Sequence, residues 1–204
     1  MSLFPAFLKL AGRRVVVVGG GPVAASKIAA LRAAQADILV VAPDVVAEIV
    51  EAGVRVERRA FEPGDLDDAW FVVAAAPPQV NRHVAEEAAT RRLFVNAVDD
   101  PSNASVYLGG VVRRSGVVVA ISTDGRAPAL AGLVREGLDA LLPDDLDRWM
   151  HVADLARRAW RADGVPMHER RPLLLAAINE LYARNDSVRP STSSGRTESA
   201  EVMA

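Results

Sequence analysis

Short hydrophobic runs alternate with helical patterns through the first half of the chain. Four consecutive valines at 15–18 are typical of a parallel strand that is buried on both faces, because such a strand need not alternate apolar and polar positions. Further strands are predicted at 38–41, 54–56, 70–75 and 93–98, with a helix over 79–92. Strands that alternate with helices predict an α/β fold with a Rossmann-type, doubly wound parallel sheet.

The pattern changes after Pro101. Two apolar segments, 106–108 and 117–121, flank a turn at 113–116 and predict a small strand pair. Apolar residues at helical spacing then predict three helices, which open near Pro128, Asp144 and Arg171. Three helices with apolar stripes are too few to enclose a core of their own, so we expect this region to pack on the first domain or to form a homodimer, and we favour the homodimer.

The first strand runs directly into a glycine-rich turn and a helix. Gly19, Gly21 and Ala24 have the spacing of the dinucleotide-binding fingerprint, in the strand–turn–helix context that this fingerprint requires. Gly19 permits the tight turn, Gly21 lets a pyrophosphate approach the backbone, and Ala24 stands where the helix packs on the strand. The helix opens at Pro22 and Val23, and its N-terminal amides would face the anion. A purely structural glycine turn is the alternative.

Other candidate ligands stand at the ends of later strands. In an open α/β sheet, ligands bind outside the carboxyl ends of the strands, near the switch in strand order. Asp44 follows Pro43 after the second strand; a carboxylate there would hold the adenosine ribose and repel a 2′-phosphate, which favours NAD over NADP. Asp44 could also be the N-cap of the next helix. Ala75 and Asn96 complete the predicted cofactor site.

These patterns divide the chain into four segments. We expect an NAD-binding domain over residues 1–112, a dimerisation region over 113–143, a C-terminal helical domain over 144–184 and a disordered tail over 185–204. The tail consists of Ser, Thr, Pro, Gly and charged residues, a composition that buries too little apolar surface to fold.

Composition excludes several other classes of function. The chain has no cysteine, so it can form no disulfide, thiolate nucleophile or zinc–thiolate site. A net charge of −2 gives no sign of a nucleic-acid partner. No apolar run approaches the roughly 20 residues that cross a bilayer, and the N-terminus lacks signal-peptide features, so we expect no membrane contact and a cytoplasmic location. The histidines lack the spacing of a helical metal pair, and no bound metal is expected.

Five blocks carry a resemblance to a known family. They are Phe4-Pro5 with Leu8 and Leu10, residues 17–27, Phe94 to Pro101, Val119 to Ala131, and Leu138 to Pro143. In this order they resemble the precorrin-2 dehydrogenase and sirohydrochlorin ferrochelatase family, the dehydrogenase module of siroheme synthase. The second half of the pattern, with its Asn-Ala-Val-Asp and Ser-Thr-x-Gly-x-x-Pro blocks, is more specific than the glycine turn alone.

The resemblance implies NAD-dependent oxidation of precorrin-2 to sirohydrochlorin and, in some members, insertion of ferrous iron in the same cleft. It places the catalytic aspartate at Asp99, whereas Asp-Asp-Pro alone is typical of an ordinary turn after a strand. The cofactor takes the hydride in this reaction, and the protein must handle a proton. The tetrapyrrole substrate carries many carboxylates, for which Ser122, Thr123 and Arg126 are candidate donors. The hydroxyls of Ser122 and Thr123 could equally cap a helix.

The chain departs from the family pattern at Ala76-Pro77, where threonine is common, and over 106–110, where an aromatic–aliphatic pair and a proline are usual. No methyltransferase domain follows, so we expect the stand-alone form. The alternative function is a non-catalytic NAD-sensing dimeric module. Such a module usually needs an output element, and the sequence contains no basic helix-turn-helix or membrane segment.

Overall fold

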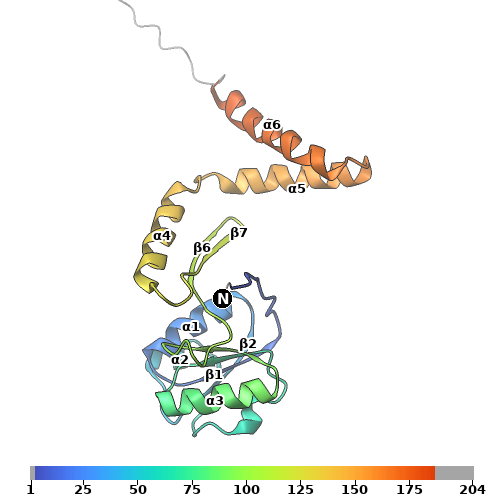
Figure 1. The fold of residues 1–204 in the computed structure, drawn as a ribbon. Coiled ribbons are helices and arrows are strands. Elements are labelled where there is room, and N and C mark those ends of the chain that lie inside the picture. The colour runs from blue at the N-terminus through green and yellow to red at the C-terminus, as the bar shows by residue number, and fades with distance from the viewer. Residues whose placement is uncertain (1–2, 187–204) are drawn as a thin grey trace, which may run out of the picture. The chain divides into compact units, whose positions relative to one another are not determined.

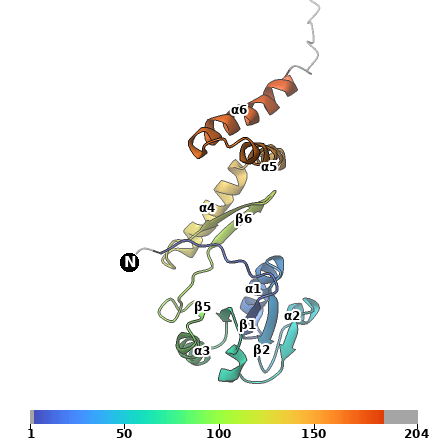
Figure 2. The same ribbon diagram turned by 90° about the vertical axis from the view of Figure 1, so that its right-hand side faces the viewer.

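The computed structural model describes residues 3–186 and forms two compact units. The first unit comprises the chain up to Val111 together with Ala120–Glu136. The second comprises Val112–Val119 and the chain from Gly137 onward. Figures 1 and 2 show the ribbon from two directions.

The first unit is built on a five-stranded parallel sheet with the order β3-β2-β1-β4-β5. The strands are β1 (Arg14–Val18), β2 (Asp37–Val41), β3 (Arg55–Glu57), β4 (Phe71–Ala74) and β5 (Phe94–Ala97). Val15, Val16 and Val17 have no exposed surface, as the valine run predicted. The strand order reverses between β1 and β4, so the Rossmann-type fold predicted from the sequence is confirmed.

Helices cover both faces of this sheet (Figure 1). On one face, Ile28 of α1 (Pro22–Ala33) and Ile49 of α2 (Ala47–Glu51) pack in one core cluster with Val17. On the other, Val84 of α3 (Pro78–Thr90) packs in a second cluster with Val16 and with Leu66 of the short 3₁₀ helix η1 (Pro63–Leu66). Successive residues of a strand point to opposite faces, so one unbroken valine run supplies both cores.

The chain after β5 forms the strand pair β6 (Gly110–Arg114) and β7 (Val117–Ile121). The strand predicted at 106–108 was wrong: the backbone amides of Ser105 and Val106 both donate to the carbonyl of Val95, at 2.9 and 3.1 Å. That segment is therefore fastened to β5, and β6 begins only at Gly110. Ser115 and Gly116 both have positive φ, 49° and 83°, and form the two-residue turn.

Three helices complete the chain: α4 (Pro128–Leu141), α5 (Leu146–Ala162) and α6 (Met167–Asp186). The first two begin as predicted, but α6 begins earlier than the expected Arg171 and contains Pro172. Its last residues include 185 and 186, which were assigned to the disordered tail; the rest of that tail, 187–204, lies outside the described residues. The predicted domain limits at 112, 143 and 184 stay a prediction.

Side-chain hydrogen bonds fix the helices of the second unit. Arg114 of β6 donates to the carbonyl of Leu142 at 2.6 Å and to Asp139 at 2.9 Å, and so holds the end of α4. The indole of Trp149 on α5 donates to the hydroxyl of Tyr182 on α6 at 2.6 Å. Between residues 3 and 186, no helix combines the length and apolarity needed to cross a membrane.

Candidate functional site

The carboxyl ends of four strands lie at one level of the sheet. Val18 is the register partner of both Val41 and Ala74, and Ala74 is in turn the partner of Ala97. The pairing continues one residue further, because the amides of the next residues donate to these strand ends. Gly19 donates to the carbonyl of Val41 at 3.0 Å, Ala75 to that of Val18 at 2.8 Å, and Val98 to that of Ala74 at 2.9 Å.

This register brings the loops that carry most of the predicted site residues to one edge of the sheet. The residues placed there are Gly19, Gly21, Pro22, Val23, Pro43, Asp44, Ala75 and Asp99. They are far apart in sequence, and only the parallel pairing makes them neighbours. The edge includes the point where the strand order reverses, which is where open α/β sheets bind their ligands.

The glycine turn is held closely between two other loops. Gly19 has a φ of 127°, and a Cβ added there would lie 2.2 Å from the carbonyl oxygen of Ala75. A Cβ on Gly20 would lie 1.8 Å from the carbonyl oxygen of Asp44, and the amide of Val46 donates to the carbonyl of Gly20 at 2.8 Å. Gly20 was missed by the sequence analysis because it occupies a variable position of the fingerprint.

Gly21 has a different environment from the two glycines before it. A Cβ added there would meet no protein atom within 4 Å, so the space beside it is open to a ligand. Gly21 is also the N-cap of α1, with no side-chain hydrogen bond, and the first turn of α1 contains no acidic residue. The N-terminal amides of α1 are therefore suited to a pyrophosphate. Ala24 is fully buried, as expected for its contact with the strand.

Asp44 is exposed in the loop after β2. The N-cap of α2 is Val46, so the alternative interpretation of Asp44 as a helix cap was wrong. Asp44 has no hydrogen bond or ion pair within residues 3–186 and is free to meet a ribose. Its contact with the cofactor stays a prediction.

Asp99 lies on a loop whose base is closed by hydrogen bonds between β5 and the segment 105–106. The amide of Val95 donates to the hydroxyl of Ser105 at 2.8 Å, and the amide of Ser105 donates back to the carbonyl of Val95 at 2.9 Å. The side-chain nitrogen of Asn96 donates to the carbonyl of Val106 at 2.9 Å. Asn96 is only 6% exposed, so its side chain holds the loop base, and its predicted contact with the cofactor stays a prediction.

The two aspartates of this loop differ in their surroundings. The carboxylate of Asp100 accepts hydrogen bonds from Ser102 at 2.7 Å and from Asn103 at 2.6 Å. The bond from Asn103, followed by that from Ser102, holds the pKa of Asp100 below its usual value. Asp99 is exposed, has a φ of 56°, and its side chain has no partner in the part of the chain that the structure describes. Of the two, only Asp99 has a carboxylate free to meet a substrate.

Tyr107 lies between the Asp99 loop and the segment that carries Ser122, Thr123 and Arg126. Its hydroxyl donates to the carbonyl of Pro101 at 3.2 Å. A Cβ on Gly125 would lie 3.3 Å from its ring. The sequence analysis did not predict this contact, because Tyr107 was assigned to a strand.

The hydroxyls of Ser122 and Thr123 make local hydrogen bonds within the 122–127 segment, before α4 begins at Pro128. The hydroxyl of Ser122 accepts from the amide of Asp124 at 3.2 Å, and that of Thr123 accepts from the amide of Ala127 at 3.2 Å. Arg126 is exposed, and its side chain has no partner among the described residues. Their predicted contacts with substrate carboxylates stay predictions.

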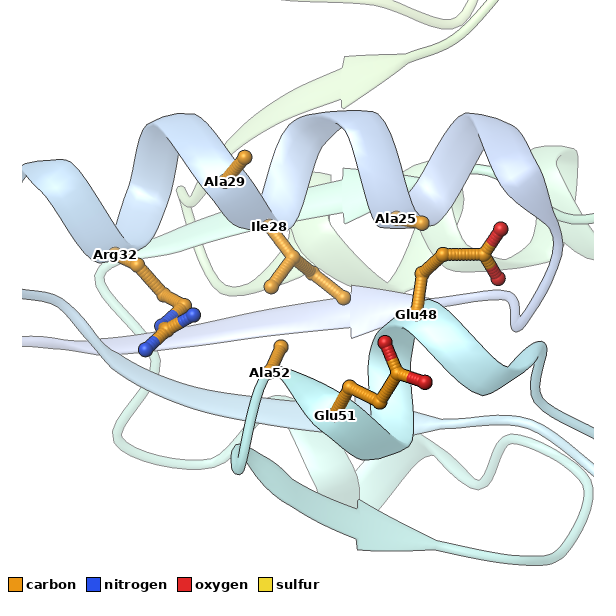
Figure 3. A pocket seen from close by; sticks show the side chains of 7 residues that line it. All are labelled: Ala25, Ile28, Ala29, Arg32, Glu48, Glu51 and Ala52. Carbon is orange, nitrogen blue, oxygen red and sulfur yellow. The ribbon is translucent and has the colours of Figure 1, made fainter.

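A shallow cavity of about 290 Å³ lies between α1 and α2, away from these residues. Figure 3 shows Ala25, Ile28 and Arg32 of α1 facing Glu48 and Glu51 of α2. None of the predicted site residues lines it. Within residues 3–186, no three His, Asp or Glu side chains are grouped so that they could hold a metal ion.

Comparison with known proteins identifies the family. Residues 6–110 match the family described as "Putative NAD(P)-binding". The chain belongs to this family. The match covers the whole parallel sheet, the glycine turn and the Asp99 loop, which are the parts that form the candidate site.

Several curated proteins are similar to this chain over more of its length. The chain is 44% identical to siroheme synthase 1 of Cronobacter sakazakii over 158 residues. The aligned region covers 75% of this chain and 34% of that protein. It is 38% identical over 188 residues to siroheme synthase of Photorhabdus laumondii, covering 90% of this chain and 40% of that protein. The chain thus spans well under half the length of these curated relatives.

Among solved structures, the chain is similar to SirC, a precorrin-2 dehydrogenase. The two have a TM-score of 0.68 and 29% sequence identity, and the similarity covers 86% of this chain and 89% of the other.

Proposed function

We propose that the chain oxidises precorrin-2 to sirohydrochlorin with NAD as the hydride acceptor. One observation carries the proposal: the free carboxylate of Asp99 stands at the same sheet edge as the open glycine turn. The similarity to a precorrin-2 dehydrogenase over most of both chains supports the same substrate. The similarity to siroheme synthases supports a role in the formation of siroheme.

The reaction removes two hydrogens from the macrocycle. NAD, when bound, supplies the acceptor for the hydride, and a proton leaves at the same time. The Asp99 carboxylate is the group placed to accept this proton or to orient the pyrrole nitrogen that loses it. The open space at Gly21 and the N-terminal amides of α1 would hold the pyrophosphate, and Asp44 the ribose, in a way that favours NAD over NADP.

The carboxylates of the substrate need hydrogen-bond donors near the Asp99 loop. Arg126, with an exposed guanidinium, is the first candidate, and the hydroxyls of Ser122 and Thr123 lie on the same segment. Tyr107 connects this segment to Pro101, two residues from Asp99. A substrate carboxylate held at 122–126 would therefore be placed beside the loop that handles the proton.

We also propose that the chain works as a cytoplasmic homodimer. Apolar side chains are exposed on two helices: Leu130, Leu133 and Leu141 on α4, and Leu173 and Leu175 on α6. Leu130, Leu133 and Leu141 share one face of α4; a monomer would leave that face in water, whereas a symmetric dimer would bury it. Light scattering after size-exclusion chromatography would measure the mass; a monomer at micromolar concentration contradicts this part of the proposal.

The decisive test is an absorbance assay with precorrin-2 and NAD. The proposed enzyme produces NADH and the sirohydrochlorin bands together. A chain that binds NAD but leaves the spectrum unchanged would be a sensor module, and the proposed oxidation would be wrong. Adding ferrous iron to the sirohydrochlorin formed then tests for metal insertion with iron as a second substrate.

A further inference from the structure

Asn81 is a buried polar residue that the proposed function does not use. It lies on α3 and is 4% exposed. The other buried residues of α3 are Val84, Ala85 and Ala88, which pack against the sheet through apolar contact alone. A buried amide on an otherwise apolar face costs free energy unless it is hydrogen-bonded, so its partner indicates what the residue does.

The partner of Asn81 is the loop that follows β4. Its side-chain oxygen accepts a hydrogen bond from the amide of Ala76 at 2.9 Å. The next two residues, Pro77 and Pro78, have no N–H, and the N-cap Pro77 provides no side-chain cap for α3. Asn81, near the start of α3, therefore supplies a hydrogen bond to the Ala75–Ala76 peptide, which Pro77 and Pro78 cannot supply.

That peptide lies against the glycine turn. A Cβ on Gly19 would be 2.2 Å from the carbonyl oxygen of Ala75 and 3.1 Å from the nitrogen of Ala76. The amide of Ala75, one peptide earlier, donates to the carbonyl of Val18 at 2.8 Å, so this loop contacts both the end of β1 and the glycine that follows it. The Ala75–Ala76 peptide thus forms one wall of the turn, and Asn81 holds it there by a contact outside the sheet.

We propose that Asn81 is a positioning residue for the dinucleotide, acting through the Ala75–Ala76 peptide on the glycine turn. The Gly19–Gly21 turn and the Ala75–Ala76 peptide must both be in place to contact the cofactor. A small displacement of either one therefore weakens binding strongly. The ligand is the NAD of the proposed function, and the inference rests on that function only for the identity of the ligand.

The test compares three variants for NADH binding by fluorescence and for thermal stability. Asn81→Leu keeps the volume and removes the acceptor; we expect Kd for NADH to rise about tenfold, the factor that one hydrogen bond is worth. In the coupled assay, KM for NAD should rise while kcat at saturating NAD changes little. Asn81→Gln keeps a neutral amide oxygen as acceptor and should restore part of the affinity. Asn81→Ala replaces the leucine variant if that variant does not fold.

Val84→Ala is the matched control. Val84 is fully buried on the same helix, so its truncation lowers Tm by creating a cavity without touching the Ala76 amide. We expect it to leave Kd for NADH unchanged. If Val84→Ala weakens NADH binding as much as Asn81→Leu does, or if Asn81→Gln restores nothing, Asn81 is a general structural residue and the inference is overturned. NADH binding without precorrin-2 oxidation would contradict the proposed function and leave this inference standing.

Discussion

Asp99 and Asp100 are adjacent in sequence, but only Asp100 has partners for its carboxylate. Asp100 accepts from Ser102 and Asn103 and closes the loop, while Asp99 sits at a φ of 56° with its carboxylate free. The left-handed backbone at Asp99 is tolerated by aspartate and asparagine better than by most residues. The loop therefore divides the pair into one residue that shapes it and one that is available for chemistry.

Asp99→Asn is expected to abolish most of the oxidation without disturbing the loop. Asparagine tolerates the same backbone angle but cannot accept the proton, so kcat should fall by about a hundredfold or more, the usual contribution of a general base. NADH affinity and Tm should remain those of the parent chain. Stopped-flow absorbance with precorrin-2 measures the rate. Full activity in this variant would remove Asp99 from the mechanism.

Gly20→Ala and Gly21→Ala should separate folding from ligand binding. The new methyl group at position 20 would strike the carbonyl of Asp44, so we expect a lower Tm and loss of NADH binding together. The methyl group at position 21 meets no protein atom, so Tm should be unchanged while NADH affinity falls, because the methyl group occupies the space of the pyrophosphate. Differential scanning fluorimetry and NADH titration check both. Normal affinity in Gly21→Ala would mean that the dinucleotide lies elsewhere.

Asp44→Ala tests the choice between NAD and NADP. Asp44 is exposed, and its backbone carbonyl lies against Gly20; its carboxylate would repel a 2′-phosphate while it binds the ribose hydroxyls. Removing it should raise KM for NAD by about tenfold, roughly the cost of a lost charge-assisted hydrogen bond, and should improve the relative use of NADP. Steady-state kinetics with both cofactors measure the ratio. An unchanged ratio would exclude Asp44 from the ribose site.

The ion pair between Arg59 and Asp65 should make stability depend on pH in the acid range. Asp65 is 6% exposed and accepts two hydrogen bonds from Arg59, which lower its pKa, and a third from the amide of Glu62. A carboxyl whose folded pKa is depressed contributes stability above its unfolded pKa of about 3.9, and this stability is lost as the pH falls towards the folded pKa.

Asp65→Asn should therefore lower Tm by several degrees at neutral pH, and the difference from the parent chain should narrow below about pH 4. Thermal melts over a series of pH values measure it. Because Asp65 lies in η1 and its hydrogen-bond partners are Arg59 and Glu62 rather than residues of the glycine turn, NADH affinity at neutral pH should not change. A Tm difference that is constant with pH would show that the ion pair does not act through the charge of Asp65.

Much of the fold could be predicted because its signals are local. The valine run, the spacing of Gly19, Gly21 and Ala24, and the helix that opens at Pro128 each depend on residues that are close in sequence. The segment 106–108 was predicted as a strand for the same local reason. It failed because Val106 is hydrogen-bonded to Val95 and Asn96, which lie within β5 and not beside it in sequence.

The sequence by itself determined the order of the elements, the Rossmann-type sheet and the glycine turn, since backbone propensity and burial periodicity are properties of short segments. Only the tertiary structure decided that Gly20 must be a glycine, that Tyr107 contacts the Asp99 loop and that Asp99 has a free carboxylate when Asp100 does not. Each of these depends on which atoms fill the space beside a residue. Gly20 and Tyr107 contact atoms that come from other loops of the chain. For the two aspartates, the conformation of their own loop brings Ser102 and Asn103 to the carboxylate of Asp100 and not to that of Asp99.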